Sequence, residues 1–225
     1  MDVKEIDIDI EEGSSGGRLR ERAYRMIKHK IISGELKPGT ILTETKLADE
    51  LGMSRTPVRE SLMKLSSTGL VKELDSHGIM VAELSLRSIL EAYDLQRALE
   101  KFAVEEIIDK DLVSSRFNRA RFDRMIEAQQ ACLENYDMWR FFQMNKAMHS
   151  EILRLTGNQK ILRIMSDLRE ELFYAGYQSI SPRVNMAEAI AEHREIIDAI
   201  EVLDRDKAIN AVVRHVERAK SRLLS

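Results

Sequence analysis

Cysteine is nearly absent from this sequence, and long apolar runs are missing. Cys132 is the single cysteine among 225 residues, which excludes a disulfide within one chain and fits a reducing compartment. No apolar stretch approaches the roughly 20 residues that cross a bilayer, and the acidic N-terminus does not have the pattern of a signal peptide. These absences predict a cytoplasmic protein with no membrane partner.

The charge of the chain is unevenly distributed along its length. The net charge of −3 would not by itself indicate a nucleic-acid partner. Residues 1–17 have a net charge of −5, residues 18–84 of +3 and residues 85–225 of −1. Because the basic excess lies in the middle segment, that segment is the candidate for nucleic-acid binding.

With 225 residues, of which 44% are hydrophobic, the chain is long enough for two modest domains. We expect an acidic disordered tail over residues 1–17, ending in the flexible sequence Gly13-Ser-Ser-Gly-Gly17. Ile6, Ile8 and Ile10 alternate with acidic residues, so the alternative to a disordered tail is a β-strand that forms against a partner. A DNA-binding domain over residues 18–84 and a helical domain over residues 85–225 follow.

Residues 54–60 predict the start of a short helix. Ser54 is expected to cap it by accepting from a free backbone N–H, and Pro57 falls in the first turn, where a missing N–H costs little. Arg55 and Arg59 are one turn apart, so both guanidinium groups emerge on one side. Paired arginines at a helix start suit phosphate oxygens and the O6/N7 edge of guanine. The segment predicts a DNA-reading helix, although an arginine pair alone is also typical of a solvated basic face.

The surrounding elements complete a winged helix-turn-helix. Residues 19–32 predict a basic helix, and Thr43 is expected to cap a second short helix that Gly52 ends. Two short helices joined by a tight turn place the second one in the major groove of DNA. Residues 70–74 and 79–82 predict a β-hairpin wing with His77 and Gly78 at its tip, where backbone can approach DNA.

Several ordered motifs occur between residues 18 and 84. They are Gly34-Glu-Leu-Lys-Pro-Gly39, Glu44 with Leu47-Ala48, Leu51-Gly52, Ser54-Arg-Thr-Pro-Val-Arg-Glu60, Leu65, Gly69-Leu70 and Gly78. Together they resemble the winged helix-turn-helix of the GntR transcription regulators. The resemblance implies base contacts by Arg55 and Arg59. It also implies phosphate contacts by Ser54 and Thr56, and a minor-groove contact at Gly78.

One position departs from this family pattern. Many members carry an arginine directly after the glutamate of the second helix, where this chain has Thr45. We expect the neighbouring Lys46 to take over part of that phosphate contact, and the base preference to differ.

Beyond residue 84 the sequence changes to amphipathic helices. Each has apolar residues at i, i+3, i+4 spacing. The predicted helices cover residues 85–110, 115–134, 137–156, 158–177 and 184–203, and Asp204 caps a last one that reaches residue 224. Short connections between them predict an antiparallel bundle. The expected fold class is therefore mainly α: a winged helix-turn-helix of three helices and a β-hairpin, followed by an antiparallel all-α bundle.

Three of the five histidines lie on different bundle helices. Apolar residues one turn away orient His149, His193 and His215 toward the core. Buried imidazoles are costly unless each finds a partner, and one divalent cation would satisfy all three. Asn145, one turn before His149, is placed to add an oxygen ligand. Hydrogen-bonded core histidines are the alternative, because spacing alone does not separate the two.

A second set of motifs covers the bundle. It consists of Asn145 with His149, Thr156-Gly157-Asn158, Glu192-His193 with Ile196-Ile197 and Ala199-Ile200, Asp204 and His215. This set resembles the effector-binding FCD domain of the FadR-type GntR subfamily. Many such domains bind Zn²⁺ or a similar cation through three histidines and an aspartate, and sense a small organic acid there. The resemblance implies the three histidines as ligands, with neutral Asn145 in the aspartate's place and a weaker affinity in consequence.

The effector side of the resemblance also departs from the pattern. The first bundle helix often carries an arginine four residues before the glutamate of a Leu-Glu pair, where this chain has Gln96, with Arg97 next to it. We take both as candidate effector contacts, together with Tyr93 and Tyr174, although aromatic residues at helical spacing are more often plain core.

Three classes of function remain open. An effector-responsive regulator would bind a near-palindromic operator as a homodimer. A constitutive DNA-binding dimer would use the bundle for dimerisation alone. A metal hydrolase is disfavoured, because Glu192, the one acidic group beside a histidine in sequence, points away from the face of His193. We therefore expect no enzyme.

Overall fold

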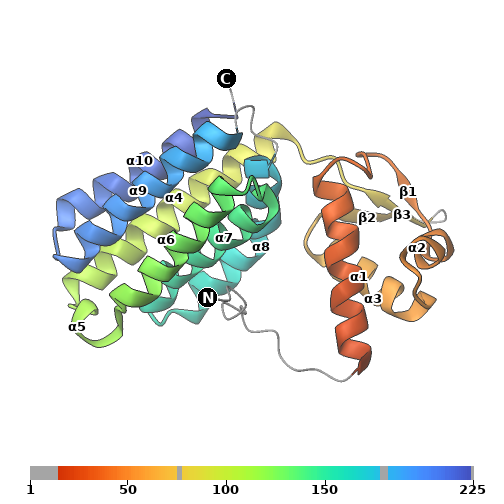
Figure 1. Cartoon of the computed structure of the whole chain (residues 1–225), viewed down its shortest axis with the longest axis horizontal. Helices are drawn as coiled ribbons and strands as arrows, with labels where there is room; N and C mark the ends of the chain where they lie inside the picture. The colour runs from red at the N-terminus through yellow and green to blue at the C-terminus, as the bar shows by residue number, and fades with distance from the viewer. Residues whose placement is uncertain (1–14, 75–77, 178–181, 224–225) are drawn as a thin grey trace. The chain divides into compact units, whose positions relative to one another are not determined.

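The computed structural model describes residues 15–74, 78–177 and 182–223 (Figure 1). The chain divides into two compact units, Met1–Ser85 and Leu86–Ser225. The predicted fold class is confirmed, since the first unit is a winged helix-turn-helix and the second is all-helical. Among the described helices, none combines the length and the apolar character needed to cross a membrane.

The first unit contains three helices and a small sheet. In chain order these are α1 (Ser15–Ile32), β1 (Ile41–Leu42), α2 (Glu44–Leu51), α3 (Arg55–Ser67), β2 (Val71–Leu74) and β3 (Gly78–Val81). Helix α1 starts before the predicted residue 19, so Ser15 to Gly17 form its first turn rather than the end of a tail. The rest of the predicted acidic tail lies outside the described residues. Ile27, Leu62 and Leu65 are fully buried between α1, α3 and the sheet.

The three strands form an antiparallel sheet in the order β1-β3-β2. The hairpin register pairs Val71 with Val81 and Leu74 with Gly78, which confirms the predicted wing strands to within one residue. Strand β1 was not predicted from the sequence. It has only two residues, and Ile41 pairs with Met80 across the chain, so no local pattern signals it.

The caps of α2 and α3 differ from each other. Thr43 accepts a hydrogen bond from the Lys46 backbone N–H at 3.4 Å, and Gly52 ends α2 with a φ of +63°. Ser54 occupies the N-cap position of α3, but its side chain makes no capping bond, so that part of the prediction is wrong. The reason is that Pro57 stands at the third helical position, where the N–H that such a cap usually binds is missing.

The second unit is a ring of helices. It comprises α4 (Leu86–Asp109), α5 (Val113–Arg116), α6 (Arg119–Glu134), α7 (Met138–Leu155), α8 (Gln159–Tyr177), α9 (Pro182–Glu201) and α10 (Arg205–Ser221). Helix α4 packs against α10 and α8, α6 packs against α9 and α7, and α9–α10 and α7–α8 close the ring. Its core contains Phe122, Phe141, Met148 and Ile152, all at most 2% exposed.

The predicted helix over residues 115–134 is two helices in the structure. Phe117 and Asn118 have extended backbone between α5 and α6, and the Asn118 side chain caps α6 through the Arg121 N–H at 3.1 Å. An asparagine that bonds its own following backbone competes with continued helix. The predicted cap Asp204 accepts from the Lys207 backbone N–H, as expected, and Asp137, predicted only as the first residue of its helix, caps α7 in the same way.

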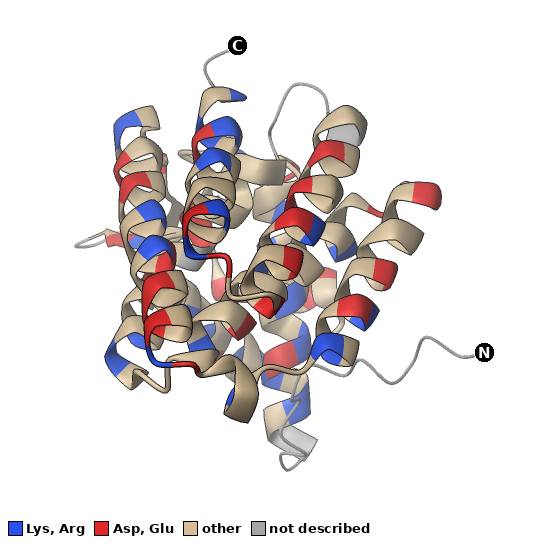
Figure 2. Ribbon diagram, turned by 90° about the vertical axis from the view of Figure 1, so that its left-hand side faces the viewer, with Lys and Arg blue, Asp and Glu red and all other residues tan. Residues whose placement is uncertain are grey.

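Acidic and basic residues are interspersed along the bundle helices (Figure 2). Several pair between neighbouring helices, including Arg119 with Asp198 at 2.7 Å and Arg205 with Asp109 at 2.9 Å. Such exposed pairs contribute little stability each, so the apolar interior holds the ring together.

Replacing Thr43 with alanine should destabilise α2 by about 1 kcal/mol, because one of its free N–H groups loses its acceptor. Amide hydrogen exchange in α2 of the full chain measures the effect. Ser54→Ala is the matched control and should leave exchange in α3 nearly unchanged. Equal protection losses from the two substitutions would contradict the difference in capping.

Candidate nucleic-acid interface and candidate metal centre

The described DNA-contact candidates lie at the helix starts of the helix-turn-helix or on its wing. Residues Thr45, Lys46, Ser54, Arg55, Thr56, Arg59 and Gly78 are all exposed. The inner faces of α2 and α3 hold Leu47, Val58 and Leu62, which are at most 2% exposed. The apolar stripe therefore fixes α3 in the unit and leaves its arginines outside.

Arg55 has a partner that sequence reasoning did not assign. Its Nη2 lies 3.4 Å from Oε2 of Glu44, the first residue of α2. The Arg55 side chain is 69% exposed, so this contact restrains the guanidinium without burying it. The two residues stand eleven positions apart, and only the turn between the helices brings them together.

The wing is described in part. His77 lies outside the described residues. Gly78 begins β3 with a φ of +97°, and a Cβ there would come 3.3 Å from the Leu42 carbonyl oxygen. The positive φ favours glycine at this position, and the close approach of the Leu42 carbonyl oxygen leaves little room for a side chain.

The three bundle histidines converge at the centre of the second unit. His149 on α7, His193 on α9 and His215 on α10 are each at most 5% exposed. One ring nitrogen from each lies within 4.8 Å of one from each of the others. The sequence thus identified the members of this cluster, and the fold brings them together.

Each Nδ1 in the cluster has its own acceptor. His149 Nδ1 donates to Glu100 Oε2 at 3.0 Å, and His215 Nδ1 donates to Glu192 Oε2 at 2.7 Å. His193 Nδ1 lies 2.8 Å from Gln129 Oε1. A carboxylate can only accept, so the bonds to Glu100 and Glu192 place the proton of His149 and His215 on Nδ1 and leave Nε2 with a free lone pair. The amide oxygen of Gln129 is an acceptor as well and favours the same tautomer of His193.

The Nε2 atoms of the three histidines have no acceptor or donor other than one another among the described residues. His215 Nε2 lies 3.3 Å from His149 Nε2, and His193 Nε2 is buried with no hydrogen-bond partner among the described residues. Burial lowers the pKa of His193 well below its ordinary value and also lowers the pKa of His215, so a bridging proton is disfavoured.

This arrangement fits a divalent cation. Two imidazoles about 2.0 Å from one tetrahedral ion lie about 3.3 Å apart, which is the separation of the His149 and His215 nitrogens. Outward bonds from Nδ1 to carboxylate or amide oxygens are the usual support of metal-ligating histidines. The three residues could therefore hold zinc or a similar ion.

A cavity of about 90 Å³ adjoins the cluster. His149, His215, Asn145, Gln96 and Tyr93 are among its lining residues. Burial raises the pKa of Tyr93 to about 12, so its hydroxyl stays protonated. A cavity of this volume is several times larger than the space that one water molecule needs.

Two further effector candidates lie elsewhere. Arg97 pairs with Asp94 and Glu217, and neither Arg97 nor the half-buried Tyr174 is among the residues described as lining the cavity. Arg97 follows Gln96 by one position and is therefore turned about 100° away from it.

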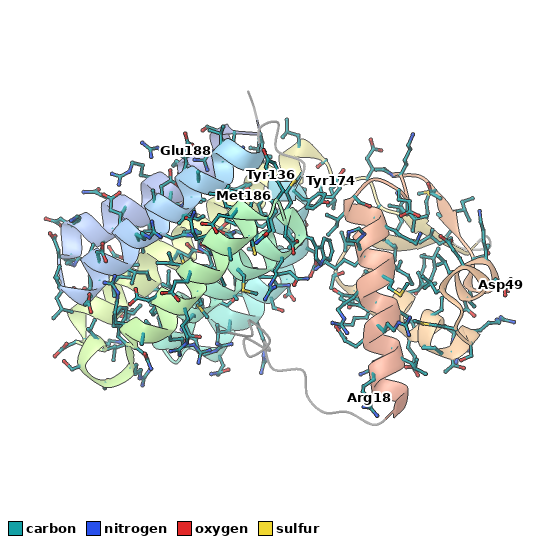
Figure 3. The ribbon with its side chains drawn as sticks, viewed as in Figure 1. Arg18, Asp49, Tyr136, Tyr174, Met186 and Glu188 are labelled. Atoms are coloured by element: carbon teal, nitrogen blue, oxygen red, sulfur yellow. The ribbon has the colours of Figure 1, made fainter. Side chains whose placement is uncertain are left out.

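Sequence reasoning missed the two cations that do line the cavity. Lys146 on α7 pairs with buried Glu170 at 3.3 Å, and Arg222 at the end of α10 pairs with Glu188 at 2.6 Å. Glu188 and Met186 are labelled on α9 in Figure 3: Met186 is buried in the cavity wall, whereas Glu188 is half exposed. No acidic residue belongs to the described lining.

Two family models match the chain. Residues 19–81 match the bacterial regulatory proteins of the gntR family, and residues 91–218 match the FCD domain. A helix-turn-helix-type transcriptional regulator in an unstable DNA locus of Streptomyces ambofaciens is 29% identical over 207 residues, which cover 90% of this chain and 84% of the relative. The gluconate operon transcriptional repressor of Bacillus subtilis (strain 168) is 26% identical over 221 residues, or 95% and 87% of the two chains.

A solved structure shares the fold. The structure of Escherichia coli McbR/YncC has a TM-score of 0.73 and 23% sequence identity, and the match covers 92% of this chain and 97% of that one. Fold and relatives define a DNA-binding regulator of transcription rather than an enzyme. The chain belongs to the GntR family, and its second unit contains the FCD domain.

The metal-free chain should lose stability as the pH falls from 7.5 to 5.5. The unfolded chain binds protons at His193 and His215 near pH 6.5, whereas in the folded chain both residues have lowered pKa values and bind protons only at lower pH. Acid therefore favours unfolding, by up to about 1.4 kcal/mol per pH unit for each residue. Thermal melts in chelator measure this slope. His193→Gln should make it shallower, and a melting temperature independent of pH would contradict the neutral, buried histidines.

Proposed function

We propose that this GntR regulator reads double-stranded DNA with α3 and responds to a small molecule at a divalent cation in its FCD domain. The observation that carries the second part is the convergence of one ring nitrogen from each of three buried histidines, whose Nδ1 atoms all lie beside acceptor oxygens. Residues 18–84 form the DNA-binding domain and residues 85–225 the effector-binding and dimerisation domain. As a regulator of transcription, the protein works on DNA in the cytoplasm.

In the DNA-binding domain, Arg55 and Arg59 contact base edges in the major groove. Ser54 and Thr56 contact phosphates, an assignment supported by the exposed side chain of Ser54, which the helix does not use as a cap. Two further sets of contacts complete the interface: Thr45 and Lys46 on α2 with phosphates, and His77 and Gly78 in the minor groove. A homodimer presents α3 twice, so the operator is near-palindromic.

In the FCD domain, His149, His193 and His215 hold the cation, and Asn145 offers an amide oxygen. Three imidazole ligands and an oxygen suit zinc. When bound, the ion supplies a fixed positive charge beside the cavity.

The lining of the cavity favours an anionic effector, such as a small organic acid. Lys146 and Arg222 are its charged residues, and most of the remaining lining is aromatic or aliphatic, with a few neutral polar side chains. Tyr93 and Gln96 add polar groups near the histidines, whereas Arg97 and Tyr174 stay outside the described lining. Effector binding in the bundle changes the spacing of the two DNA-binding domains in the dimer and so the affinity for the operator.

Arg59→Ala should reduce binding to the preferred DNA sequence by about 10- to 100-fold, since a bidentate arginine–guanine contact contributes about 1–3 kcal/mol of discrimination. The preferred duplex is first selected from random DNA with the wild-type chain, and affinity is then measured by fluorescence anisotropy at fixed salt. The titration should saturate at two chains per duplex.

Arg87→Ala is the matched control, because Arg87 is an exposed arginine on α4 paired only with Glu91 among the described contacts. It should leave the affinity unchanged. If Arg59→Ala keeps the full preference for the selected duplex over random DNA, the assignment of α3 as the reading helix is wrong.

Removal of the cation should lower the melting temperature of the chain. A ligand present at 100 times its dissociation constant stabilises the folded state by about 2.7 kcal/mol, and a chelator abolishes that contribution. Protein purified without chelator should carry about one equivalent of metal by elemental analysis, and zinc chloride added after dialysis should restore the melt.

The cation site would be contradicted if the purified protein carries no stoichiometric metal and if neither EDTA nor zinc changes its melting temperature. The histidines would then be hydrogen-bonded core residues, and the bundle a dimerisation module of a constitutive DNA-binding protein.

A further inference from the structure

Two buried carboxylates stand behind the histidines that line the cavity. Glu100 on α4 accepts from His149, and Glu192 on α9 accepts from His215. His193 does not line the cavity, and its partner is the neutral amide of Gln129. The acidic partners therefore belong to the two histidines that a bound effector would approach.

Glu100 and Glu192 have different surroundings. Glu100 is 0% exposed, and its other hydrogen bond comes from the neutral Gln96 Nε2 at 2.9 Å. In the described part of the chain, no lysine or arginine pairs with it. A carboxylate buried in this way is costly unless a positive charge lies nearby.

Glu192 already has such charges. Its Oε1 accepts from Arg218 Nη1 at 2.9 Å and from Arg222 Nη2 at 3.4 Å. These arginines take up part of its negative charge, so less of it is available to a cation held by His215.

The proposed ligands themselves bring no charge. Three neutral imidazoles and the amide of Asn145 would leave both charges of a divalent ion uncompensated inside an apolar bundle. A carboxylate one imidazole away offsets part of that charge and makes the ligand nitrogen more basic.

Resting on the proposed cation site, we propose that Glu100 is its main charge-compensating and positioning residue, with Glu192 in the same role to a smaller extent. Glu100 fixes the orientation of His149 and supplies the negative charge that Asn145 lacks. A bound cation would thus supply the positive charge that buried Glu100 lacks, and Glu100 would supply the negative charge that the neutral ligands lack.

Glu100→Gln should weaken zinc binding by about 10- to 100-fold, the usual effect of losing such a partner. Glu192→Gln should weaken it less, since Arg218 and Arg222 share that charge. The full chain is stripped with chelator, and zinc chloride is titrated in competition with a chromophoric chelator of known affinity. Melting temperatures are recorded with and without zinc.

Glu151→Gln is the matched control. Glu151 is a carboxylate on α7 with 7% exposure, but it pairs with Arg121 and Arg154 rather than with a histidine. This variant should keep the wild-type zinc affinity. Adding Asn145→Asp to the Glu100→Gln chain should restore most of the lost affinity, because the negative charge returns as a ligand.

The outcomes separate the two proposals. Wild-type chain that binds no zinc overturns the cation site itself. If Glu100→Gln leaves the zinc affinity unchanged, only the role of Glu100 is wrong. The same holds if the melting temperature of the metal-free Glu100→Gln chain drops while its shift on adding zinc stays at the wild-type size. Glu192→Gln with a larger loss than Glu100→Gln overturns the assignment of the main charge. If Glu100→Gln does not fold, Asn145→Asp in the wild-type background must raise zinc affinity, or compensation by charge is wrong.

Discussion

Burial of three imidazoles at one point constrains most of the second unit. The ring closes around His149, His193 and His215, which come from α7, α9 and α10, and their Nδ1 acceptors come from α4, α6 and α9. Five of the six long helices thus meet through one polar cluster in an otherwise apolar core. Since a buried polar group without a partner is expensive, the rotation of each helix about its axis is restricted by the hydrogen bond that it must make.

The same cluster explains how a ligand could alter the whole bundle. A cation or an anion at this point contacts side chains from several helices at once, so small changes in side-chain position are shared among them. Packed helices respond by shifting as units rather than by deforming continuously. The cavity beside the cluster, with Lys146 and Arg222 in its wall, gives a second molecule access to that polar centre.

In the first unit, the polar groups of α3 that we propose contact DNA are ones that the packing of the helix does not use. Val58, Leu62 and Leu65 supply the packing of α3, and Thr43 and Gly52 define the limits of α2. Pro57 removes the N–H that Ser54 would otherwise bind, which leaves the hydroxyl exposed beside Arg55. Stability comes from the buried side of the helix, and the side chains on the other side are exposed to solvent.

The sequence by itself determined the helices, the wing strands, most of the caps and the inward direction of the three histidines, because these depend on spacing and on residues within one turn of each other. It also identified the family on motifs that the comparisons bear out. Only the tertiary structure decided the partners across elements: β1 with β3, Glu44 with Arg55, and Glu100 with His149. The helix break at Phe117 and the missing Ser54 cap are local features, but the sequence prediction missed them. They depend on which backbone N–H groups are available: Asn118 binds one, and Pro57 removes another. Contacts between residues 49 or more positions apart, such as Glu100 with His149, have no periodic signature, since they arise only when packing sets the helices side by side.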